Sequence, residues 1–249
     1  MTPVSPELVC FATDQELIAQ ISHFNQLYRA GSSPISDAHF DVLFAELESR
    51  QPNHPLVANV QPSAVDSKGR VAHPFPMLST EKAYDLTEVK SWLLKVADFV
   101  GESLESGKTL IRISPKFDGC AARYDANGAY RLITRGDGAF GNVFCHLIDR
   151  GLVFKGVSEV GEIVVPESYF QTTLRPAGVV HPRNFVAGLI SADTLSDLAL
   201  KALSDGAVHY VSYRGWHQNV VLPLSEVLAR FDEIEAAIIA NCPYRTDGV

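Results

Sequence analysis

A change in hydrophobic periodicity divides the chain into two parts. Early in the chain, apolar side chains recur every three or four residues, whereas beyond Thr109 they alternate in several short runs. A helix-period pattern does not suit a strand, because successive side chains of a strand point to opposite faces. Five prolines accumulate between Gln51 and Pro76, which favours an extended linker between the parts. We therefore predict two domains, residues 1–65 and residues 66–249.

The first part is predicted to be a helical hairpin. Thr13 and Glu16 have the spacing of a capping box, and Ser36 can cap a second helix. The apolar stripes behind these caps are Leu17, Ile21, Phe24 and Tyr28 in the first helix, and Phe40, Leu43, Phe44 and Leu47 in the second. Gly31 and Pro52 mark the expected ends of the two helices.

The second part mixes strands and helices without regular alternation. Asp85 is expected to open a helix with Val89, Trp92, Leu93, Val96 and Phe99 on one face. Strands are expected at residues 111–113, 130–134, 160–165 and 208–213, and further helices at residues 194–203 and 227–239. This mixture predicts an α+β domain with mostly antiparallel sheets.

Composition narrows the functional classes. The 249 residues include 21 Lys and Arg against 29 Asp and Glu, a formal charge of -8, which does not by itself attract nucleic acid. The four cysteines form no CxxC pair, which argues against a zinc ribbon or a disulfide framework and favours reduced thiols in a cytoplasm. The first ten residues carry no basic region or long apolar stretch, so we expect neither a secretory signal nor a membrane anchor.

Lys116 and Asp118 form the most informative pair, within the run from Ser114 to Gly119, here called the lysine motif. Two-residue spacing in an extended segment puts both side chains on one side, where an amine and a carboxylate can face one pocket. Lysine is a nucleophile only when neutral, and burial or a neighbouring cation lowers its pKa from about 10.4. The alternative is a surface ion pair of little energetic value, which this motif alone leaves ahead.

Six segments together resemble the NAD-dependent DNA ligases, in the same order and through nearly the whole chain. They are His73-Pro-Phe-Pro-Met77-Leu-Ser79-Thr80, the lysine motif, Thr134-Arg135-Gly136-Asp137-Gly138, Gly161-Glu162-Ile-Val-Val-Pro166, His181-Pro-Arg183-Asn184-Phe-Val-Ala-Gly188 and Thr246-Asp247-Gly248-Val249. They look like the segment before the adenylation motif, that motif, the TRGDG segment, the GEVF-type strand, the NPRNxxAG loop and the start of the DGVV motif. The resemblance implies a nucleotidyltransferase domain behind a small helical domain.

The helical hairpin is similar to the family's small N-terminal domain. Asp37, Phe40 and Asp41 share one helix face, and the family has an acidic-aromatic-acidic cluster at the corresponding place. The resemblance implies that this cluster, with Tyr28 beside it, recognises the nicotinamide mononucleotide half of NAD. From the residues alone another interpretation stays open: Phe40 and Tyr28 complete the apolar stripes, and the two Asp are solvated.

The resemblance also implies an adenylation reaction. Lys116 attacks the α-phosphorus of NAD, nicotinamide mononucleotide leaves, and a lysyl-AMP phosphoramidate remains. The resemblance implies that Arg135 contacts the nucleotide and that Glu162 contacts its ribose. It implies that Ser79 and Thr80 line the nucleoside pocket and that Mg2+ binds the phosphates. Asp118 and Asp247 are implied to orient the lysine or the ribose. No protein ligand to a metal is predicted. The alternatives are a plain turn residue for Arg135 and an exposed strand position for Glu162.

Several positions depart from the family pattern. Ser114, predicted to line the cofactor pocket, stands where the family usually has Glu, so adenine recognition is expected to rest on other groups. Phe40 stands where the acidic-aromatic cluster usually has Tyr, and Arg29 stands near an expected His. Residues 189–191 replace an SLRQ-type continuation and lack its Arg. Because the lysine motif is intact, we interpret these differences as divergence.

The resemblance stops at Val249, before the family's OB-fold, zinc finger and helix-hairpin-helix domain. The chain is therefore expected to be a truncated form or one subunit of a split ligase, as in some large bacteriophages, and its Met1 start favours the split form. The implied partners are nicked duplex DNA, in replication and repair, and a second subunit with the OB-fold and further DNA-binding domains.

Two other functions remain open from the sequence. One is a non-catalytic nucleotide-binding subunit or scaffold of a split ligase. The other is an ATP-dependent nucleotidyltransferase, since that superfamily shares the lysine motif. The pair Asp37 and Asp41 favours NAD, because ATP offers no nicotinamide mononucleotide to recognise.

Overall fold

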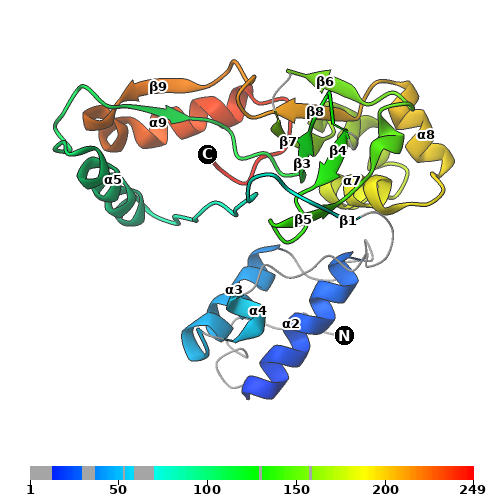
Figure 1. Ribbon diagram of the computed structural model, residues 1–249, viewed down its shortest axis with the longest axis horizontal. Coiled ribbons are helices and arrows are strands. Elements are labelled where there is room, and N and C mark those ends of the chain that lie inside the picture. The colour runs from blue at the N-terminus through cyan, green and yellow to red at the C-terminus, as the bar shows by residue number, and fades with distance from the viewer. Residues whose placement is uncertain (1–12, 30–36, 53, 59–69, 129–130, 157–158) are drawn as a thin grey trace.

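A computed structural model describes residues 13–29, 37–52, 54–58, 70–128, 131–156 and 159–249, and of residues 25–29, 37–39, 41, 55 and 58 it describes only the backbone. The predicted domain boundary, the Ser36 cap and the Gly31 stop lie outside the described residues, as do the side chains of Tyr28, Asp37 and Asp41. Figure 1 shows a helical group beneath a longer body, and the body has a five-stranded sheet at one end and a two-stranded sheet at the other.

The helical group confirms the predicted hairpin. It comprises α2 (Asp14–Arg29), α3 (Asp37–Arg50) and α4 (Pro55–Ala58). The capping box at the start of α2 is formed, because Glu16 N donates to Thr13 Oγ1 at 3.3 Å and Thr13 N donates to the Glu16 carboxylate at 2.8 Å. The two stripes meet in one small core of Leu17, Ile21, Phe24, Leu43 and Leu47.

The stretch predicted as an extended linker is not wholly irregular. It contains α4 and the strand β1 (Arg70–Ala72), which pairs antiparallel with β5 (Phe140–Asn142). Both elements are too short to show a hydrophobic period, so the sequence offered only the prolines, which predicted an extended linker. The pairing of β1 with β5 joins the end of the stretch to the second part of the chain.

The five-stranded sheet has the order β4-β3-β7-β8-β6, and only the β6–β8 pair is parallel. Its strands are β3 (Cys120–Tyr124), β4 (Leu132–Thr134), β6 (Val153–Lys155), β7 (Val160–Val164) and β8 (His209–Ser212). The helices at this end are α6 (Glu167–Tyr169), α7 (Pro182–Ser191) and α8 (Asp197–Ser204). The mixed composition and the mostly antiparallel pairing confirm the predicted α+β class.

The opposite end joins β2 (Leu110–Ile113) and β9 (Val220–Pro223) to the helices α5 (Leu86–Val100) and α9 (Val227–Asn241). Strand β2 alternates as predicted, with Ile111 and Ile113 buried in the core that Leu93 and Ala97 of α5 share. The predicted face of α5 was too wide, since Phe99 is 90% exposed and Trp92 is 43% exposed. Those two residues lie at the edge of the stripe, whereas the residues at its centre contact the core.

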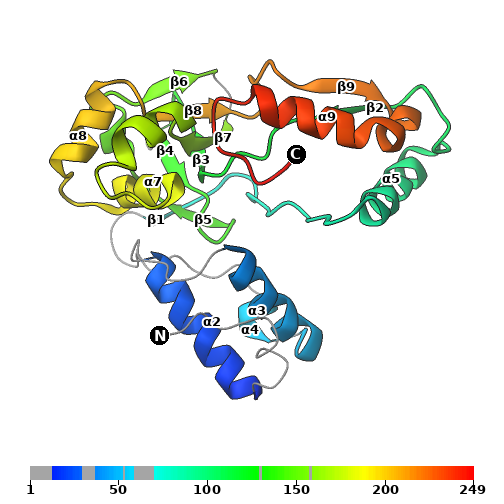
Figure 2. The ribbon, with the colours of Figure 1, turned by 180° about the vertical axis from the view of Figure 1, so that it is seen from behind.

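The two ends meet along the C-terminal residues. Figures 1 and 2, from opposite sides, both place the C-terminus between the two-stranded and the five-stranded sheets. An aromatic cluster holds this region: Phe117 lies 5.1 Å from Trp216 and 5.7 Å from Tyr244 between ring centroids, edge to face in both cases. None of the described helices is both long and apolar enough to span a bilayer.

The lysine motif passes so close to β7 that only glycine fits at its end. A Cβ atom added at Gly119 would lie 2.2 Å from the carbonyl oxygen of Ile163 and 2.6 Å from Val164 Cγ1. The first of these neighbours is backbone within the sheet, which cannot move without disturbing the pairing of β3 with β7.

Gly119→Ala is therefore expected to lower the free energy of unfolding by about 1–3 kcal/mol, the usual cost of overpacking. The matched control is Gly188→Ala within α7, where an added Cβ meets nothing within 4 Å and is expected to stabilise by about 0.5–1 kcal/mol. Urea unfolding of both variants measures the difference. Equal stabilities would contradict the close approach.

Candidate functional site

Residues 243–248, here called the C-terminal segment, run antiparallel to the lysine motif. Lys116 N donates to the carbonyl oxygen of Gly248 at 2.9 Å, and Asp247 N donates to that of Lys116 at 2.9 Å. Asp118 N donates to the carbonyl oxygen of Arg245 at 3.0 Å. Two sequence motifs more than 120 positions apart thus become one piece of structure.

This pairing brings Asp247 to the predicted nucleophile. Lys116 Nζ lies 3.0 Å from Asp247 Oδ2, and the two side chains are 39% and 38% exposed. The amine of Lys116 is therefore partly exposed and is held by a carboxylate. A charge-assisted hydrogen bond of this length fixes the direction of the amine while solvent still reaches it.

A cavity of about 430 Å³ opens beside Lys116. It is lined by the chain before α5, by the α5 start, by α9 and by the end of the C-terminal segment: Glu81, Lys82, Ala83, Tyr84, Asp85, Leu86, Val89, Lys116, Phe231, Asp232, Glu235, Asp247, Gly248 and Val249. Its wall is predominantly polar, with five carboxylates and the two amines of Lys82 and Lys116. The cavity size is in the range of small-molecule sites.

Asp118 does not line this cavity with Lys116. Its side chain is 2% exposed and faces one imidazole and two guanidinium groups: His181 Nε2 at 3.4 Å, Arg183 Nη1 at 3.7 Å and Arg245 Nε at 3.8 Å. The expected single pocket shared by the lysine and Asp118 is therefore not what the structure shows. Removal of these neighbours would leave the charge of Asp118 buried and uncompensated. The carboxylate of Asp118 therefore holds the three side chains in place.

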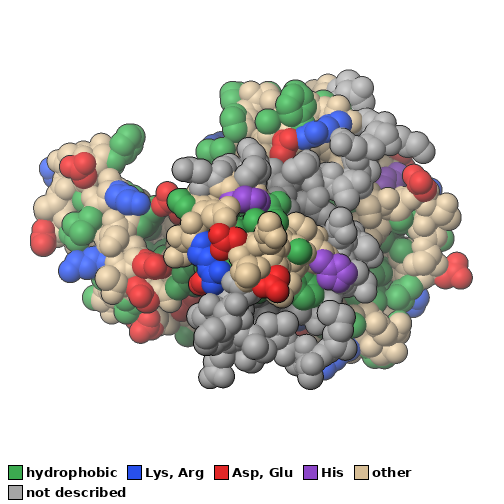
Figure 3. All heavy atoms as spheres, turned by 90° about the horizontal axis from the view of Figure 1, so that it is seen from below, with side chains coloured by type: hydrophobic (Ala, Val, Ile, Leu, Met, Phe, Trp, Pro, Cys, Tyr) green, Lys and Arg blue, Asp and Glu red, His purple; other side chains and the backbone are tan. Residues whose placement is uncertain are grey.

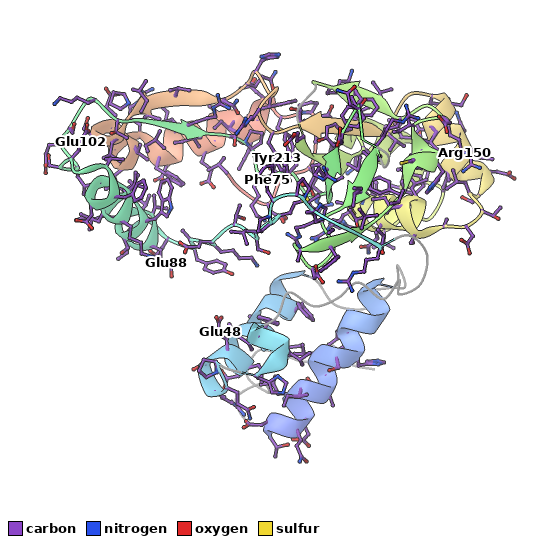
Figure 4. The ribbon with its side chains drawn as sticks, viewed as in Figure 1. Glu48, Phe75, Glu88, Glu102, Arg150 and Tyr213 are labelled. Carbon is purple, nitrogen blue, oxygen red and sulfur yellow. The ribbon has the colours of Figure 1, made fainter. Side chains whose placement is uncertain are left out.

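Glu162 lies in the middle of the five-stranded sheet, with Ala121 and Val211 as its strand neighbours. It is 7% exposed, so the alternative of an exposed strand position is wrong. Burial raises the pKa of Glu162 to about 7, although the hydrogen bond from the Tyr213 hydroxyl and the charges of Arg183 and Arg135 act in the opposite direction. Figure 4 shows Tyr213 near the middle of the body, between its two sheets.

Arg135 precedes a tight turn that fixes its backbone. Gly136 and Gly138 have φ angles of 58° and 90°, a region that glycine adopts without strain, and Arg135 N donates to the carbonyl oxygen of Ala121 at 2.9 Å. His73 Nε2 lies 3.1 Å from the carbonyl oxygens of both Thr134 and Arg135. Arg135 is thus a turn residue, as the alternative interpretation had it. Its charge also lowers the pKa of Glu162, against the larger effect of burial.

The chain after His73 follows the same turn. Met77 N donates to the carbonyl oxygen of Gly138 at 2.8 Å, so this segment is docked on the turn just before Ser79 and Thr80. Both of these residues are exposed, whereas Ser114 is half-buried at the start of the lysine motif. Their predicted roles in a nucleoside pocket stay predictions.

The predicted cluster on the helical hairpin is described only at Phe40. Its ring centroid lies 6.2 Å from that of Phe44, and it packs against the core of the hairpin. Phe40 therefore belongs to the apolar stripe but is only partly buried, and its role in recognising the cofactor stays a prediction. The roles of Tyr28, Asp37 and Asp41 stay predictions, since their side chains lie outside the described residues.

Sequence reasoning missed Tyr213, and it missed the charge cluster of His181, Arg183 and Arg245 as a unit. Tyr213 follows Val211 by two residues, and Val211 pairs with Glu162, so strand alternation was a usable signal. No local signal connects Arg245 with Asp118, because their contact depends on how the C-terminal segment returns to the lysine motif.

The groups present suit a nucleotide. A carboxylate such as that of Glu162 accepts hydroxyl donors of a sugar, and Lys116, Arg135, Arg183 and Arg245 supply positive charge for phosphates. Within the part of the chain that the structure describes, no group of three or more His, Cys, Asp or Glu side chains could hold a metal ion. We therefore assign no residue to Mg2+. On the face seen in Figure 3, acidic and basic side chains lie interspersed.

Comparison with known proteins gives one consistent family. A family model described as the NAD-dependent DNA ligase adenylation domain matches residues 67–149. The chain is 36% identical to a DNA ligase of Desulfatibacillum aliphaticivorans over 98% of its own length, and 32% identical to a DNA ligase of Shewanella baltica over 99%. It is also 32% identical over 89% of its length to DNA ligase 2 of Streptomyces coelicolor. The chain spans 38% of the length of each of these relatives.

The raised pKa of Glu162 predicts a pH-dependent stability. The native state keeps the proton that the unfolded chain releases above pH 4.5, so the free energy of unfolding is expected to fall as pH rises from 4.5 to about 7. Glu162→Gln cannot titrate and should lose this slope in urea unfolding measured across that range. Glu48→Gln on α3, labelled in Figure 4, controls for removal of an exposed carboxylate. Parallel curves for wild type and Glu162→Gln would contradict the account.

Proposed function

We infer that this protein attaches AMP, taken from NAD, to Lys116. The inference starts from residues 67–149, which match the model of the NAD-dependent DNA ligase adenylation domain family. The observation that carries the proposal is the amine of Lys116, held 3.0 Å from Asp247 beside an open cavity. The lysine motif and the segment that aligns its nucleophile are both intact and paired. NAD is the substrate of this step, and its adenylate half is what the protein retains.

The proposed step balances as a phosphoryl transfer. The bond from Lys116 Nζ to the α-phosphorus forms while the bond from that phosphorus to the oxygen of nicotinamide mononucleotide breaks. The bonding electron pair leaves with nicotinamide mononucleotide as a phosphate oxyanion. The Lys116 ammonium releases one proton to solvent before the attack, and the nitrogen releases a second proton to solvent as its bond to phosphorus forms. Asp247 orients the amine for attack in line with the leaving group, which is where most of the catalysis of such transfers arises.

The other residues hold the nucleotide in this proposal. Glu162, supported by Tyr213, accepts a ribose hydroxyl, and Arg135 contacts the nucleotide. Ser79, Thr80 and Ser114 line the nucleoside pocket. Asp118 is a positioning residue, because it arranges Arg183 and Arg245 rather than touching the reacting atoms. Mg2+ bound to the phosphates neutralises oxygen charge, which is the chemistry that the ion supplies in such sites.

The domain of residues 1–65 is proposed to bind the nicotinamide mononucleotide half through Tyr28, Asp37, Phe40 and Asp41. Asp37 and Asp41 carry the negative charge that complements a pyridinium ring, and the aromatic residues offer faces for it. Closure of this domain over the site of residues 66–249 would exclude water before transfer.

The later steps are proposed to need further protein. AMP on Lys116 would pass to the 5′-phosphate of nicked duplex DNA, in replication or repair in the cytoplasm. A second ligase subunit with an OB-fold and DNA-binding domains would hold the nick. The formal charge of -8 supports this arrangement, because an acidic chain does not by itself attract DNA. Nick sealing that does not rise when a candidate subunit is added would sink this part.

The mass of the intact chain after incubation with NAD and Mg2+ tests the adenylation. We expect one AMP adduct with NAD, none with ATP, and none in Lys116→Ala. Asp247→Asn keeps the hydrogen bond but removes the charge, and is expected to lower the adenylation rate about 10-fold or more. Absence of an adduct under every condition would instead favour a non-catalytic nucleotide-binding subunit or scaffold.

The hairpin assignment has its own test. Asp37→Ala is expected to raise the KM for NAD about 10-fold or more, because a charged contact to the nicotinamide half is lost. Glu48→Ala on the same helix, whose side chain is exposed, is the matched control and should leave the KM unchanged. An unaltered KM in Asp37→Ala would show that the hairpin does not recognise the cofactor.

A further inference from the structure

A buried histidine supports the C-terminal segment from behind. His209, on β8, is 9% exposed, and its Nδ1 lies 2.7 Å from the hydroxyl oxygen of Tyr244. Its Nε2 lies 2.9 Å from the carbonyl oxygen of Gly206. The two rings meet edge to face with centroids 5.6 Å apart. Neither residue belongs to any of the motifs that point to adenylation.

These contacts fix the protonation of the ring. A carbonyl oxygen only accepts hydrogen bonds, so Nε2 carries the proton and donates it to Gly206. Nδ1 then offers a lone pair, and the Tyr244 hydroxyl donates to it. Burial lowers the pKa of His209 from 6.5, and the charge of Lys155 on β6 acts in the same direction. The neutral imidazole is therefore an acceptor that protonation would abolish.

Tyr244 is the point where the C-terminal segment is anchored. It is 6% exposed, pairs with Pro166 after β7, and packs its ring against Phe117 and Trp216. The preceding Pro243 accepts a hydrogen bond from Glu167 N at 2.8 Å. One residue further along lies Arg245, which faces Asp118, and three residues further along lies Asp247, which faces Lys116.

We propose that His209 is a positioning residue for the Lys116 site, acting through the Tyr244 hydroxyl to hold Asp247 against the nucleophile. The proposal rests on the proposed adenylation of Lys116. A shift of Tyr244 is expected to displace Asp247, because only two residues separate them and one of these, Thr246, pairs with Phe117 of the lysine motif. Loss of the His209–Tyr244 hydrogen bond therefore misplaces Asp247 and slows adenylation without removing any group that touches the substrate.

The proposal also links the site to pH. The titratable and charged groups around His209 are Lys155 on β6 and, in the C-terminal region, Tyr244 with Cys242 beside it. None of these described neighbours is a carboxylate that would stabilise an imidazolium. When His209 is protonated below its lowered pKa, Nδ1 becomes a donor and faces the Tyr244 hydroxyl without an acceptor.

Three variants separate positioning from folding. Tyr244→Phe removes the donor, His209→Leu removes the acceptor, and His209→Asn places a carbonyl oxygen near the position of Nδ1 without titrating. Tyr169→Phe is the matched control, since Tyr169 donates a hydrogen bond of the same 2.7 Å length to Asp205 on an exposed surface. Each full-length chain is incubated with saturating NAD and Mg2+, and the rate of AMP attachment is followed by intact mass.

We expect Tyr244→Phe and His209→Leu to lower the saturated rate about 3- to 10-fold, the effect of one lost hydrogen bond, with the KM for NAD unchanged. His209→Asn should restore most of the rate, and Tyr169→Phe should match wild type. As pH falls below 6.5, the wild-type rate should fall relative to that of His209→Asn. Titration of Glu162, whose pKa burial raises to about 7, affects both chains, so their ratio reports on His209.

A readout without NAD keeps this inference apart from the proposed function. Trp216 lies 5.9 Å from Tyr244, and Trp92→Phe leaves it as the one tryptophan. The fluorescence of Trp216 should change below pH 6.5 in the Trp92→Phe chain but not in the chain that also carries His209→Asn. A missing AMP adduct in wild type would overturn the proposed function alone. Unchanged rates in folded Tyr244→Phe, or identical pH responses in wild type and His209→Asn, would overturn the positioning role.

Discussion

The backbone pairing of the C-terminal segment with the lysine motif is the constraint on which the rest of the site depends. Three hydrogen bonds of 2.9–3.0 Å join the two extended chains between Lys116 and Gly248. Because side chains alternate along paired strands, this register decides which residue meets the lysine and which meets Asp118. A slip of one residue would turn Asp247 away from the amine. The aromatic cluster and the His209–Tyr244 contact secure that register from the opposite side.

Buried charge gives the site its second level of organisation. Asp118 and Glu162 are both nearly inaccessible, yet each is met by polar or cationic groups from a different part of the chain. Arg183 acts on both carboxylates, so the two clusters are electrostatically connected. Such an arrangement contributes little to stability relative to apolar packing, and its value lies in holding charges in fixed places. A fixed set of charges is what phosphoryl transfer requires.

The sequence predicted the parts of the fold that have a clear local signal. The capping box of α2, the alternation of β2 and the hairpin core all follow from residue spacing, and all are present. It failed where the signal is short or depends on distant partners. Strand β1 has three residues, Phe99 is 90% exposed, and the helix α7 was taken for a loop although Pro182 at its first turn is a usual helix start.

The site divides in the same way. Lys116, Asp118, Arg135, Glu162 and Asp247 were identified by motif, yet their geometry was not predictable. Asp118 turned out to face Arg245, a contact set by long-range chain return rather than by the two-residue spacing to Lys116. Tyr213 and His209 carry no motif, and their roles follow from strand register and burial. Residue spacing predicts which side chains share a face of a strand. Which side chains are buried, and which partners they meet, depends on how the strands assemble into the sheet.

The central claim is that this register makes Lys116 the acceptor of AMP from NAD. Peptide mapping after incubation with NAD and Mg2+ tests it most directly, because trypsin cleaves after Arg112 and Arg123 but not after a modified lysine. The account predicts a single adenylated peptide of residues 113–123, with the AMP on Lys116. AMP on another lysine, or no adenylated peptide from a folded chain, would contradict it.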